Sequence, residues 1–177
     1  MSQPIPLVLT PLNVRHAPAM LAWMRDPEVA ENLGLRSEPS LERTLAWLAK
    51  AAEDSTTVPL AIEWKSRHIG NVIIDRIDYY LGTGRISIYI GDAAARGMKL
   101  GQGSLKLAAE YAFETLGLHK IWLTVHVHNA RAIAAYTAAG FAVEGVLRDE
   151  FILRGKRCNA LLMGLLRIPM ELSQQAA

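Results

Sequence analysis

The fold is decided by one stretch of the chain, which reads Ile86-Ser87-Ile88-Tyr89-Ile90-Gly91-Asp92-Ala93-Ala94-Ala95-Arg96-Gly97-Met98-Lys99-Leu100-Gly101-Gln102-Gly103. Its first five residues alternate as a half-buried strand does. Beyond Gly103 the apolar residues recur at helical spacing and form one stripe, made of Leu105, Ala108, Ala109, Ala112, Phe113 and Leu116. The stretch therefore predicts a strand, a tight glycine-bearing turn and the start of a helix.

The turn has the composition of a phosphate-binding site. A helix start presents backbone N–H groups without partners and the positive end of the helix dipole. Gly97 and Gly101 let an anion approach the main chain, and Arg96 and Lys99 add positive charge. On the glycines alone, an ordinary loop that enters a helix is the better interpretation, because short glycine patterns have a high false-positive rate.

Spacing excludes two familiar nucleotide-binding motifs. A triphosphate-binding loop needs Gly-x4-Gly-Lys-Ser/Thr, whereas the fifth residue after Gly97 is Gln102. The dinucleotide-binding fingerprint would need a glycine where the chain has Lys106. An unrelated nucleotide-binding domain is therefore the weakest of the interpretations.

The turn resembles the pyrophosphate-binding motif of the GCN5-related N-acetyltransferases (GNAT), which is written Gln/Arg-x-x-Gly-x-Gly/Ala. Arg96 and Gly101 match this motif, and Lys99 stands where its first glycine is usual. A second family hallmark is an Asn-x6-Tyr-x3-Gly-Phe run after a strand, which this chain matches at Asn129, Tyr136, Gly140 and Phe141. The two ends of the chain, around residues 12–29 and 144–163, resemble the branch that acetylates ribosomal protein N-termini and nucleotide-linked amino sugars.

The resemblance covers nearly the whole chain and implies one N-acetyltransferase domain over residues 1–170. The small and polar residues at 171–177 predict a frayed tail. The resemblance implies a single-domain α+β fold with a central, mostly antiparallel mixed sheet, a parallel strand pair at the cofactor site and flanking helices. The order of predicted elements agrees, because an antiparallel meander is followed by strand, helix and a terminal hairpin. A right-handed crossover would place the strands around Ile88 and Val125 side by side and parallel. Two predicted helices, Val14–Arg25 and Pro39–Ala52, would flank the acceptor site.

The resemblance also implies acetyl-CoA as co-substrate. Main-chain groups near Ile88 and Ile90 would pair with the pantetheine arm and polarise the thioester carbonyl. The implied cofactor-binding residues are Ile88, Ile90, Arg96, Gly97, Met98, Lys99, Leu100, Gly101, Gln102, Asn129 and Tyr136. No metal site is expected, because His126 and His128 lack further ligands at a recognisable spacing.

Tyr136 is the predicted catalytic residue, as the proton donor to the departing thiolate. It follows Asn129 by seven residues, so both can face the same side of a helix. Because a thiol titrates near ~8.5 and a tyrosine near ~10, complete proton transfer would be uphill by ~2 kcal/mol unless the site lowers the tyrosine pKa. The phenol can then act mainly as a hydrogen-bond donor, and the alternative is an aromatic residue of the core.

The general base is left open by the sequence. A primary amine is mostly protonated at neutral pH, so some group must take its proton. The candidates lie on predicted strands or next to them, and each is more typical of a structural or solvated residue: Glu63, Asp75, Asp78, His126 and His128.

Composition narrows the class of partner. The 177 residues suffice for one domain, and 19 basic against 17 acidic residues give a net charge of +2, without the basic footprint of a nucleic-acid-binding protein. The single cysteine, Cys158, cannot form an internal disulfide, which is typical of a cytoplasmic protein. No apolar run approaches the ~18 residues that span a bilayer, so no membrane partner is expected.

The leading hypothesis is transfer of an acetyl group from acetyl-CoA to a primary amine by direct attack on the thioester. Residues 69–78 and 86–91 look most like those of acetyltransferases that act on nucleotide-linked amino sugars, which favours such a small molecule as the acceptor. N-terminal acetylation of a ribosomal or other protein is one alternative, and a non-catalytic acyl-CoA-binding module is an alternative of another class. A homodimer is possible.

Overall fold

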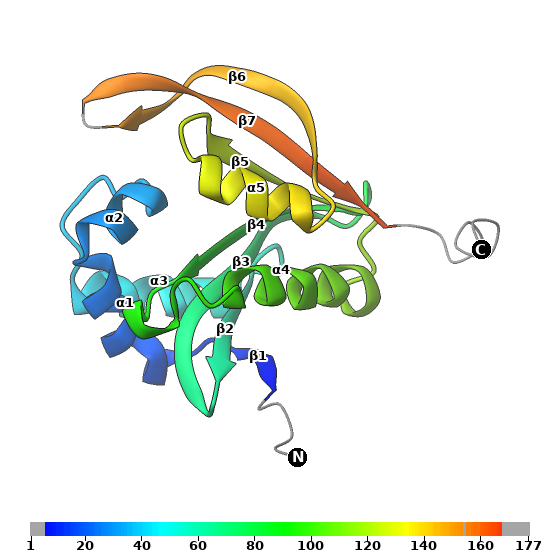
Figure 1. Cartoon of the computed structure of the whole chain (residues 1–177). Coiled ribbons are helices and arrows are strands. Elements are labelled where there is room, and N and C mark those ends of the chain that lie inside the picture. Colours follow the sequence, from blue (N-terminus) through cyan, green and yellow to red (C-terminus); the bar gives the residue numbers. More distant parts are fainter. Residues whose placement is uncertain (1–5, 154, 168–177) are drawn as a thin grey trace.

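The computed structural model describes residues 6–153 and 155–167, so the predicted tail at 171–177 lies outside the described residues (Figure 1). Seven strands form one sheet in the order β1-β2-β3-β4-β5-β7-β6. Their bounds are β1 Leu7–Pro11, β2 Val58–Trp64, β3 Arg67–Asp78, β4 Thr83–Ile90, β5 Lys120–His126, β6 Ala142–Leu153 and β7 Lys156–Leu166. The predicted α+β architecture is confirmed.

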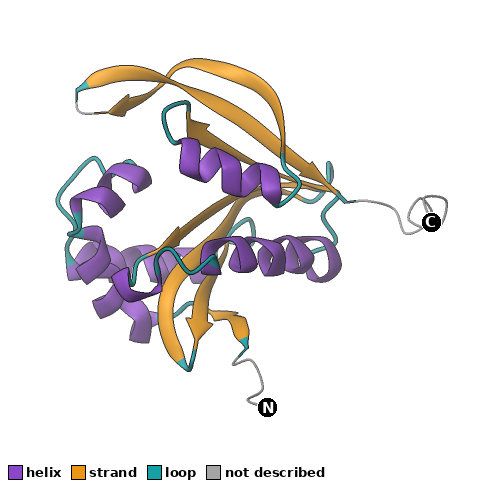
Figure 2. Ribbon diagram, viewed as in Figure 1, coloured by secondary structure: helices purple, strands orange, loops and turns teal. Residues whose placement is uncertain are grey.

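Helices cover both faces of the sheet (Figure 2). Before the sheet's second strand come η1 Val14–His16, α1 Ala17–Met24, α2 Pro27–Leu33 and α3 Leu41–Glu53. Between the later strands come η2 Ala93–Ala95, α4 Leu100–Glu110, the π-helical turn η3 Tyr111–Thr115 and α5 Ala130–Ala138. None of the described helices is long and apolar enough to cross a membrane.

The short helix α2 was not predicted, and its first turn shows why it forms. The Asp26 side chain accepts a hydrogen bond from the backbone N–H of Glu28 at 3.0 Å, and Pro27 occupies the first helical position. Gly34 ends the helix in the left-handed conformation, at φ +62°. The Asp26-Pro27 pair therefore ends α1 and also starts a second helix.

Two apolar clusters lie on opposite faces of the sheet. The larger one is packed beneath α4 and contains fully buried side chains such as Leu105, Ile121 and Met163. The smaller one lies beneath α1 and α3 and includes Met20 and Leu48. Burying a side chain of this size contributes about 1.5–3 kcal/mol, so both faces add to stability.

The parallel pair β4·β5 positions the site. The two strands are in register from Thr83 opposite Lys120 to Arg85 opposite Trp122, and the pairing ends there. The predicted parallel arrangement is confirmed, but around Ile88 and beyond the strands have parted. The sheet is therefore open at its centre, between the ends of β4 and β5 that are not paired with each other.

Candidate active site

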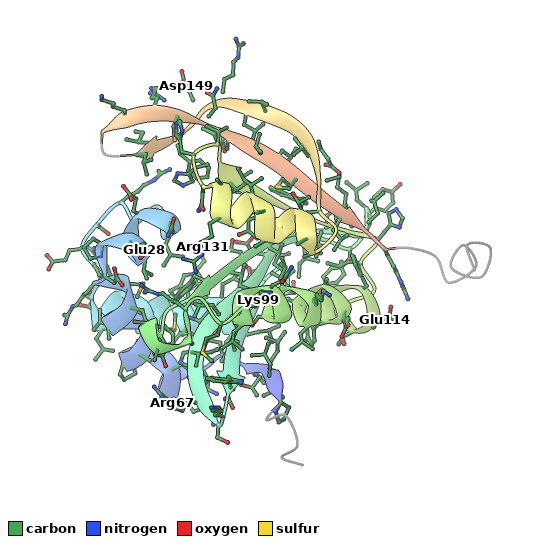
Figure 3. The ribbon with its side chains drawn as sticks, viewed as in Figure 1. Glu28, Arg67, Lys99, Glu114, Arg131 and Asp149 are labelled. Carbon is green, nitrogen blue, oxygen red and sulfur yellow. The ribbon has the colours of Figure 1, made fainter. Side chains whose placement is uncertain are left out.

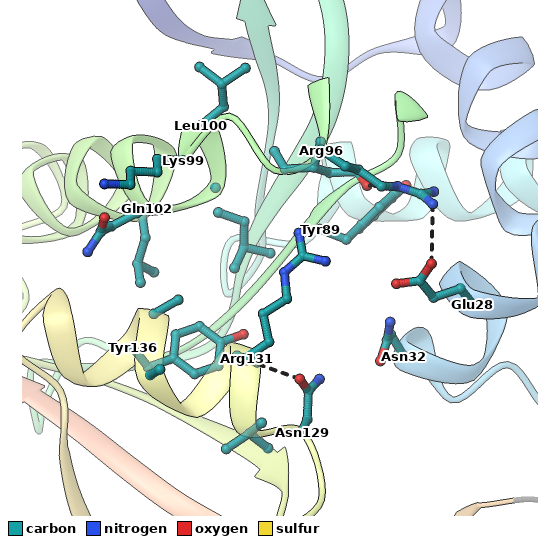
Figure 4. A pocket seen from close by; sticks show the side chains of 18 of the residues that line it. Glu28, Asn32, Tyr89, Arg96, Lys99, Leu100, Gln102, Asn129, Arg131 and Tyr136 are labelled. Atoms are coloured by element: carbon teal, nitrogen blue, oxygen red, sulfur yellow. Dashed lines mark hydrogen bonds and ion pairs between the residues drawn. The ribbon is translucent and has the colours of Figure 1, made fainter. Parts of the chain in front are cut away.

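A cavity of about 560 Å³ opens where β4 and β5 part (Figure 4). Its wall includes side chains from α2, β4, the turn before α4, β5, α5 and β6. Ten of the predicted site residues line it: Ile88, Ile90, Arg96, Gly97, Lys99, Leu100, Gly101, Gln102, Asn129 and Tyr136. Met98 is not in this lining and is 51% exposed, so the structure does not bring this predicted residue to the cavity.

The turn before α4 has the backbone shape of an anion cradle. Gly97 and Lys99 adopt left-handed conformations, at φ +79° and +59° respectively. Lys99 thus takes the conformation that favours the glycine usual at this motif position. Lys99 directly precedes α4, and its side chain does not cap the helix. The N–H groups of the first turn of α4 therefore have no capping side chain at the end of the helix that borders the cavity.

Arg96 lines the cavity, and its positive charge is paired with carboxylates beside the turn. Its guanidinium donates to Asp26 at 2.9 Å and to Glu28 at 3.4 Å, and also to the backbone carbonyls of Ile90 at 3.3 Å and Gly91 at 3.1 Å. Two carboxylates therefore neutralise it. The reason is that α2, which the sequence did not predict, brings both acids beside the turn.

Arg131 is a basic residue of the site that sequence reasoning missed. It belongs to the first turn of α5, and its side chain extends into the cavity from the side opposite α2 (Figure 4). Figure 3 shows Arg131, Lys99 and Glu28 around the same opening, each from a different helix or its border. Its position two residues after Asn129 was the available signal.

Asn129 and Tyr136 come from the two ends of one short helix. Asn129 caps α5, since its side-chain oxygen accepts from the backbone N–H of Ala132 at 3.0 Å. Tyr136 lies two turns later, with its ring centroid 6.0 Å from that of Phe141 and its hydroxyl toward the cavity (Figure 4). Burial raises the pKa of Tyr136, the opposite of what complete proton transfer would need. The phenol thus stays protonated at neutral pH and can donate a hydrogen bond.

A second tyrosine, Tyr89, lines the cavity on the face of the sheet away from α4. Asn71, which is fully buried, donates from its side-chain amide to the Tyr89 hydroxyl oxygen at 2.6 Å. The oxygen of the same amide bonds to Nε2 of His68 at 2.8 Å. Burial raises the pKa of Tyr89 to about 12. Strand alternation was the signal for this residue, because Ile88 and Ile90 face the α4 side.

The five candidate bases are now separated by position. Glu63 bonds to Thr10, Asp75 pairs with Arg85, and Asp78 caps the turn after β3. These three and His128 are not among the residues that line the cavity, whereas His126 is.

His126 is 9% exposed and stacks on Phe151 with ring centroids 4.3 Å apart. Its Nε2 is buried without a hydrogen-bond partner among the described residues, and burial lowers its pKa. In the described part of the chain, no three His, Cys, Asp or Glu side chains are grouped to hold a metal ion.

Comparisons with known proteins agree with this geometry. The acetyltransferase (GNAT) domain model matches residues 6–142. A spermidine N(1)-acetyltransferase of Escherichia coli (strain K12) is 41% identical over 68 residues, which are 38% of this chain and 37% of that relative. The Vibrio cholerae spermidine N(1)-acetyltransferase is 32% identical over 99 residues, 56% of this chain and 57% of that relative. The chain thus matches from about a third to somewhat over half of these relatives' length.

Solved structures match over a larger part of the chain. The Vibrio cholerae spermidine N-acetyltransferase in complex with CoA and spermine has a TM-score of 0.86 and 24% identity, over 90% of this chain and 95% of that one. A mutant of that enzyme has a TM-score of 0.80 and 25% identity, over 90% and 93%. The predicted family is confirmed by the family model, and the predicted fold by the solved structures. The chain belongs to the acetyltransferase (GNAT) domain family.

Proposed function

We propose that this chain transfers the acetyl group of acetyl-CoA to a primary amine of a polyamine of the spermidine class. The observation that carries the proposal is the opening between β4 and β5, which leaves the edge of β4 beyond Arg85 unpaired by β5 and lined by Ile88 and Ile90. An extended pantetheine arm can pair with such an edge by strand addition. The thioester then lies at the centre of the sheet, between the coenzyme end and the acceptor end of the cavity.

The coenzyme end is formed by the turn and by α5. The pyrophosphate would bind the N–H groups at the start of α4, with Gly97 and Gly101 allowing close approach. Lys99, Gln102 and Arg131 supply polar or charged side chains around that end. The Tyr136 hydroxyl would donate to the sulfur as the C–S bond breaks.

The charge of the acceptor end favours a cationic amine. Its wall is α2, which contains no basic residue and carries Glu31 and Glu28, the latter paired with Arg96 together with Asp26, so two carboxylates face one guanidinium. Burial lowers the pKa of His126, a residue of the cavity wall, and the negative charge of Glu31 opposes that shift. A polyamine, positively charged along its length, is attracted there, whereas the diphosphate of a nucleotide-linked sugar is repelled.

The reaction needs no covalent intermediate on the protein. The neutral amine attacks the thioester carbonyl carbon, so the C–N bond forms as the C–S bond breaks. The amine loses one proton and the leaving thiolate gains one.

The cytoplasm, predicted from the single cysteine, is the proposed setting, and a homodimer stays a prediction.

The test is release of free CoA thiol from acetyl-CoA in the presence of a panel of amines. The panel contains spermidine, spermine, putrescine, a nucleotide-linked amino sugar and a peptide with a free N-terminus. We expect turnover with spermidine, and a spermidine KM that rises with ionic strength because the attraction is electrostatic. Turnover only with the amino sugar or the peptide would replace the acceptor. Binding of acetyl-CoA without any turnover would favour the non-catalytic module.

A further inference from the structure

We infer that Arg96 is a positioning residue that holds the acceptor wall of the cavity in place, rather than a ligand of the coenzyme phosphates. The inference rests on the proposed function, since it assigns α2 to the acceptor. It begins with the four groups that the guanidinium contacts: two carboxylates of the α2 region and two carbonyls at the end of β4.

The first pair of contacts fixes the start of α2. Asp26 uses one carboxylate oxygen to cap α2 through the N–H of Glu28, at 3.0 Å, and the other to accept from Arg96, at 2.9 Å. The bond from Arg96 is the main cause that lowers the pKa of Asp26, so this carboxylate stays charged at neutral pH. The cap and the ion pair therefore depend on one side chain.

The helix α2 buries little apolar surface of its own. It has seven residues, and of these only Val29 is buried, at 4% exposed. An element with so little buried apolar surface is held weakly and opens readily. Its position, and that of Glu28, Val29 and Asn32 on the cavity wall, therefore depends strongly on the polar contacts at its first turn.

The second pair of contacts joins Arg96 to the end of β4. The Ile90 and Gly91 carbonyls belong to the point where β4 ends, at the edge of the opening. Gly91 has no room for a side chain, because an added Cβ would overlap the Trp23 ring of α1. This part of the main chain is thus confined between α1 and Arg96. It gives the guanidinium a rigid anchor against which α2 is held.

Two other interpretations make different forecasts. A phosphate ligand would need a free positive charge, but Arg96 is paired with two acids and its side chain is 21% exposed. A surface ion pair would be worth little and would affect neither substrate. Three of the four bonds of Arg96, to Asp26 and to the two carbonyls, are partly buried, and bonds from a charged donor are stronger than neutral ones.

The experiment compares Arg96→Gln with its parent in steady-state kinetics and calorimetry. We expect the spermidine KM to rise about tenfold or more, which is the effect of losing a hydrogen bond to a charged group, with the acetyl-CoA Kd within about threefold of the parent. Asp26→Asn keeps a capping side chain and loses the ion pair, so it should raise the spermidine KM as well. The double variant should be no worse than Arg96→Gln, since Arg96→Gln already lacks the ion pair that Asp26→Asn removes.

Arg67→Gln is the matched control. Arg67 forms a 2.9 Å ion pair with Asp92, close to the same turn, but it does not reach α2 (Figure 3). We expect parental KM and Kd values from this variant. Amide hydrogen exchange of α2 gives a readout that needs no substrate: exchange should become faster in Arg96→Gln and stay parental in Arg67→Gln.

The outcomes separate the inference from the function it rests on. A weakened acetyl-CoA Kd with an unchanged spermidine KM would make Arg96 a phosphate ligand and overturn the inference. If Arg96→Gln left both the kinetics and the hydrogen exchange of α2 unchanged, the contacts of Arg96 would be no more than a surface ion pair, and the inference would be wrong. Faster α2 exchange in a protein whose parent acetylates no amine would keep Arg96 as the link to α2 and overturn the proposed function.

Discussion

At the scale of single residues, Tyr136 is where the functional and structural interpretations differ most. Its hydroxyl faces the cavity, and burial keeps it protonated. For Tyr136→Phe we expect kcat to fall about 100-fold or more with acetyl-CoA affinity nearly unchanged, because the phenol acts on the developing thiolate. The measurement uses saturating acetyl-CoA with a pre-steady-state check on product release. A core role would instead leave turnover within a few-fold and cost about 1 kcal/mol of stability.

Substitutions at Lys99 and at Gly101, in the same turn, should have different effects on stability and on acetyl-CoA binding. Lys99 is held at φ +59°, so Lys99→Gly should raise the free energy of unfolding by about 1 kcal/mol and leave acetyl-CoA binding close to parental.

Gly101→Val should weaken acetyl-CoA binding about tenfold or more, because its methyl groups extend into the cradle. Gly101→Ala is the control, since its Cβ would lie an ordinary 3.6 Å from Ile90. Parental binding by Gly101→Val in calorimetry would remove the cradle from this turn.

At the scale of elements, α5 depends on its cap. Asn129 accepts a hydrogen bond from the N–H of Ala132, so Asn129→Ala should lower the free energy of unfolding by about 1 kcal/mol. Asn129→Ser keeps a capping oxygen and should lose little. Urea unfolding of the three proteins gives the comparison. If Asn129→Ser loses as much stability as Asn129→Ala, the side chain acts at this position through something other than the cap.

The elements show what local sequence can and cannot predict. The alternation of β4 and the apolar stripe of α4 are properties of neighbouring residues, and both elements were predicted. Asp26-Pro27 carries a stop and a start signal together, so the end of α1 was predicted and α2 was not. The π-helical turn, in which the N–H of Leu116 bonds to the carbonyl of Tyr111, has no periodic signal.

At the scale of the whole molecule, the site could be predicted wherever its parts are continuous in the chain. The turn and α5 each carry their residues within one segment, and ten of the eleven predicted positions line the cavity. The environment of Arg96 could not be predicted, because its partner Asp26 is 70 residues away in sequence. Arg96 and Asp26 come together only in the folded chain, where the start of α2 lies beside the end of β4.

The stability of the whole fold should depend on pH through its buried and half-buried histidines. Burial lowers the pKa of His16, His68 and His126 below the ordinary 6.5, so the folded state favours their neutral forms. Their contribution is then complete above pH 6.5 and is lost as the pH falls from 6.5 through the folded pKa values, since the unfolded chain binds more protons there. The lowered carboxylate pKa of Asp26 acts in a separate window, below about pH 4.

Urea unfolding at pH 7.5, 6.5 and 5.5 should therefore show a free energy of unfolding that decreases toward acid. His68→Gln keeps a donor for the side-chain oxygen of Asn71 and removes one titrating group, so its free energy should decrease less steeply over this range. A matched variant, His119→Gln, replaces an exposed histidine and should follow the parent. Equal slopes for the parent and for His68→Gln would show that protonation of His68 is not linked to folding.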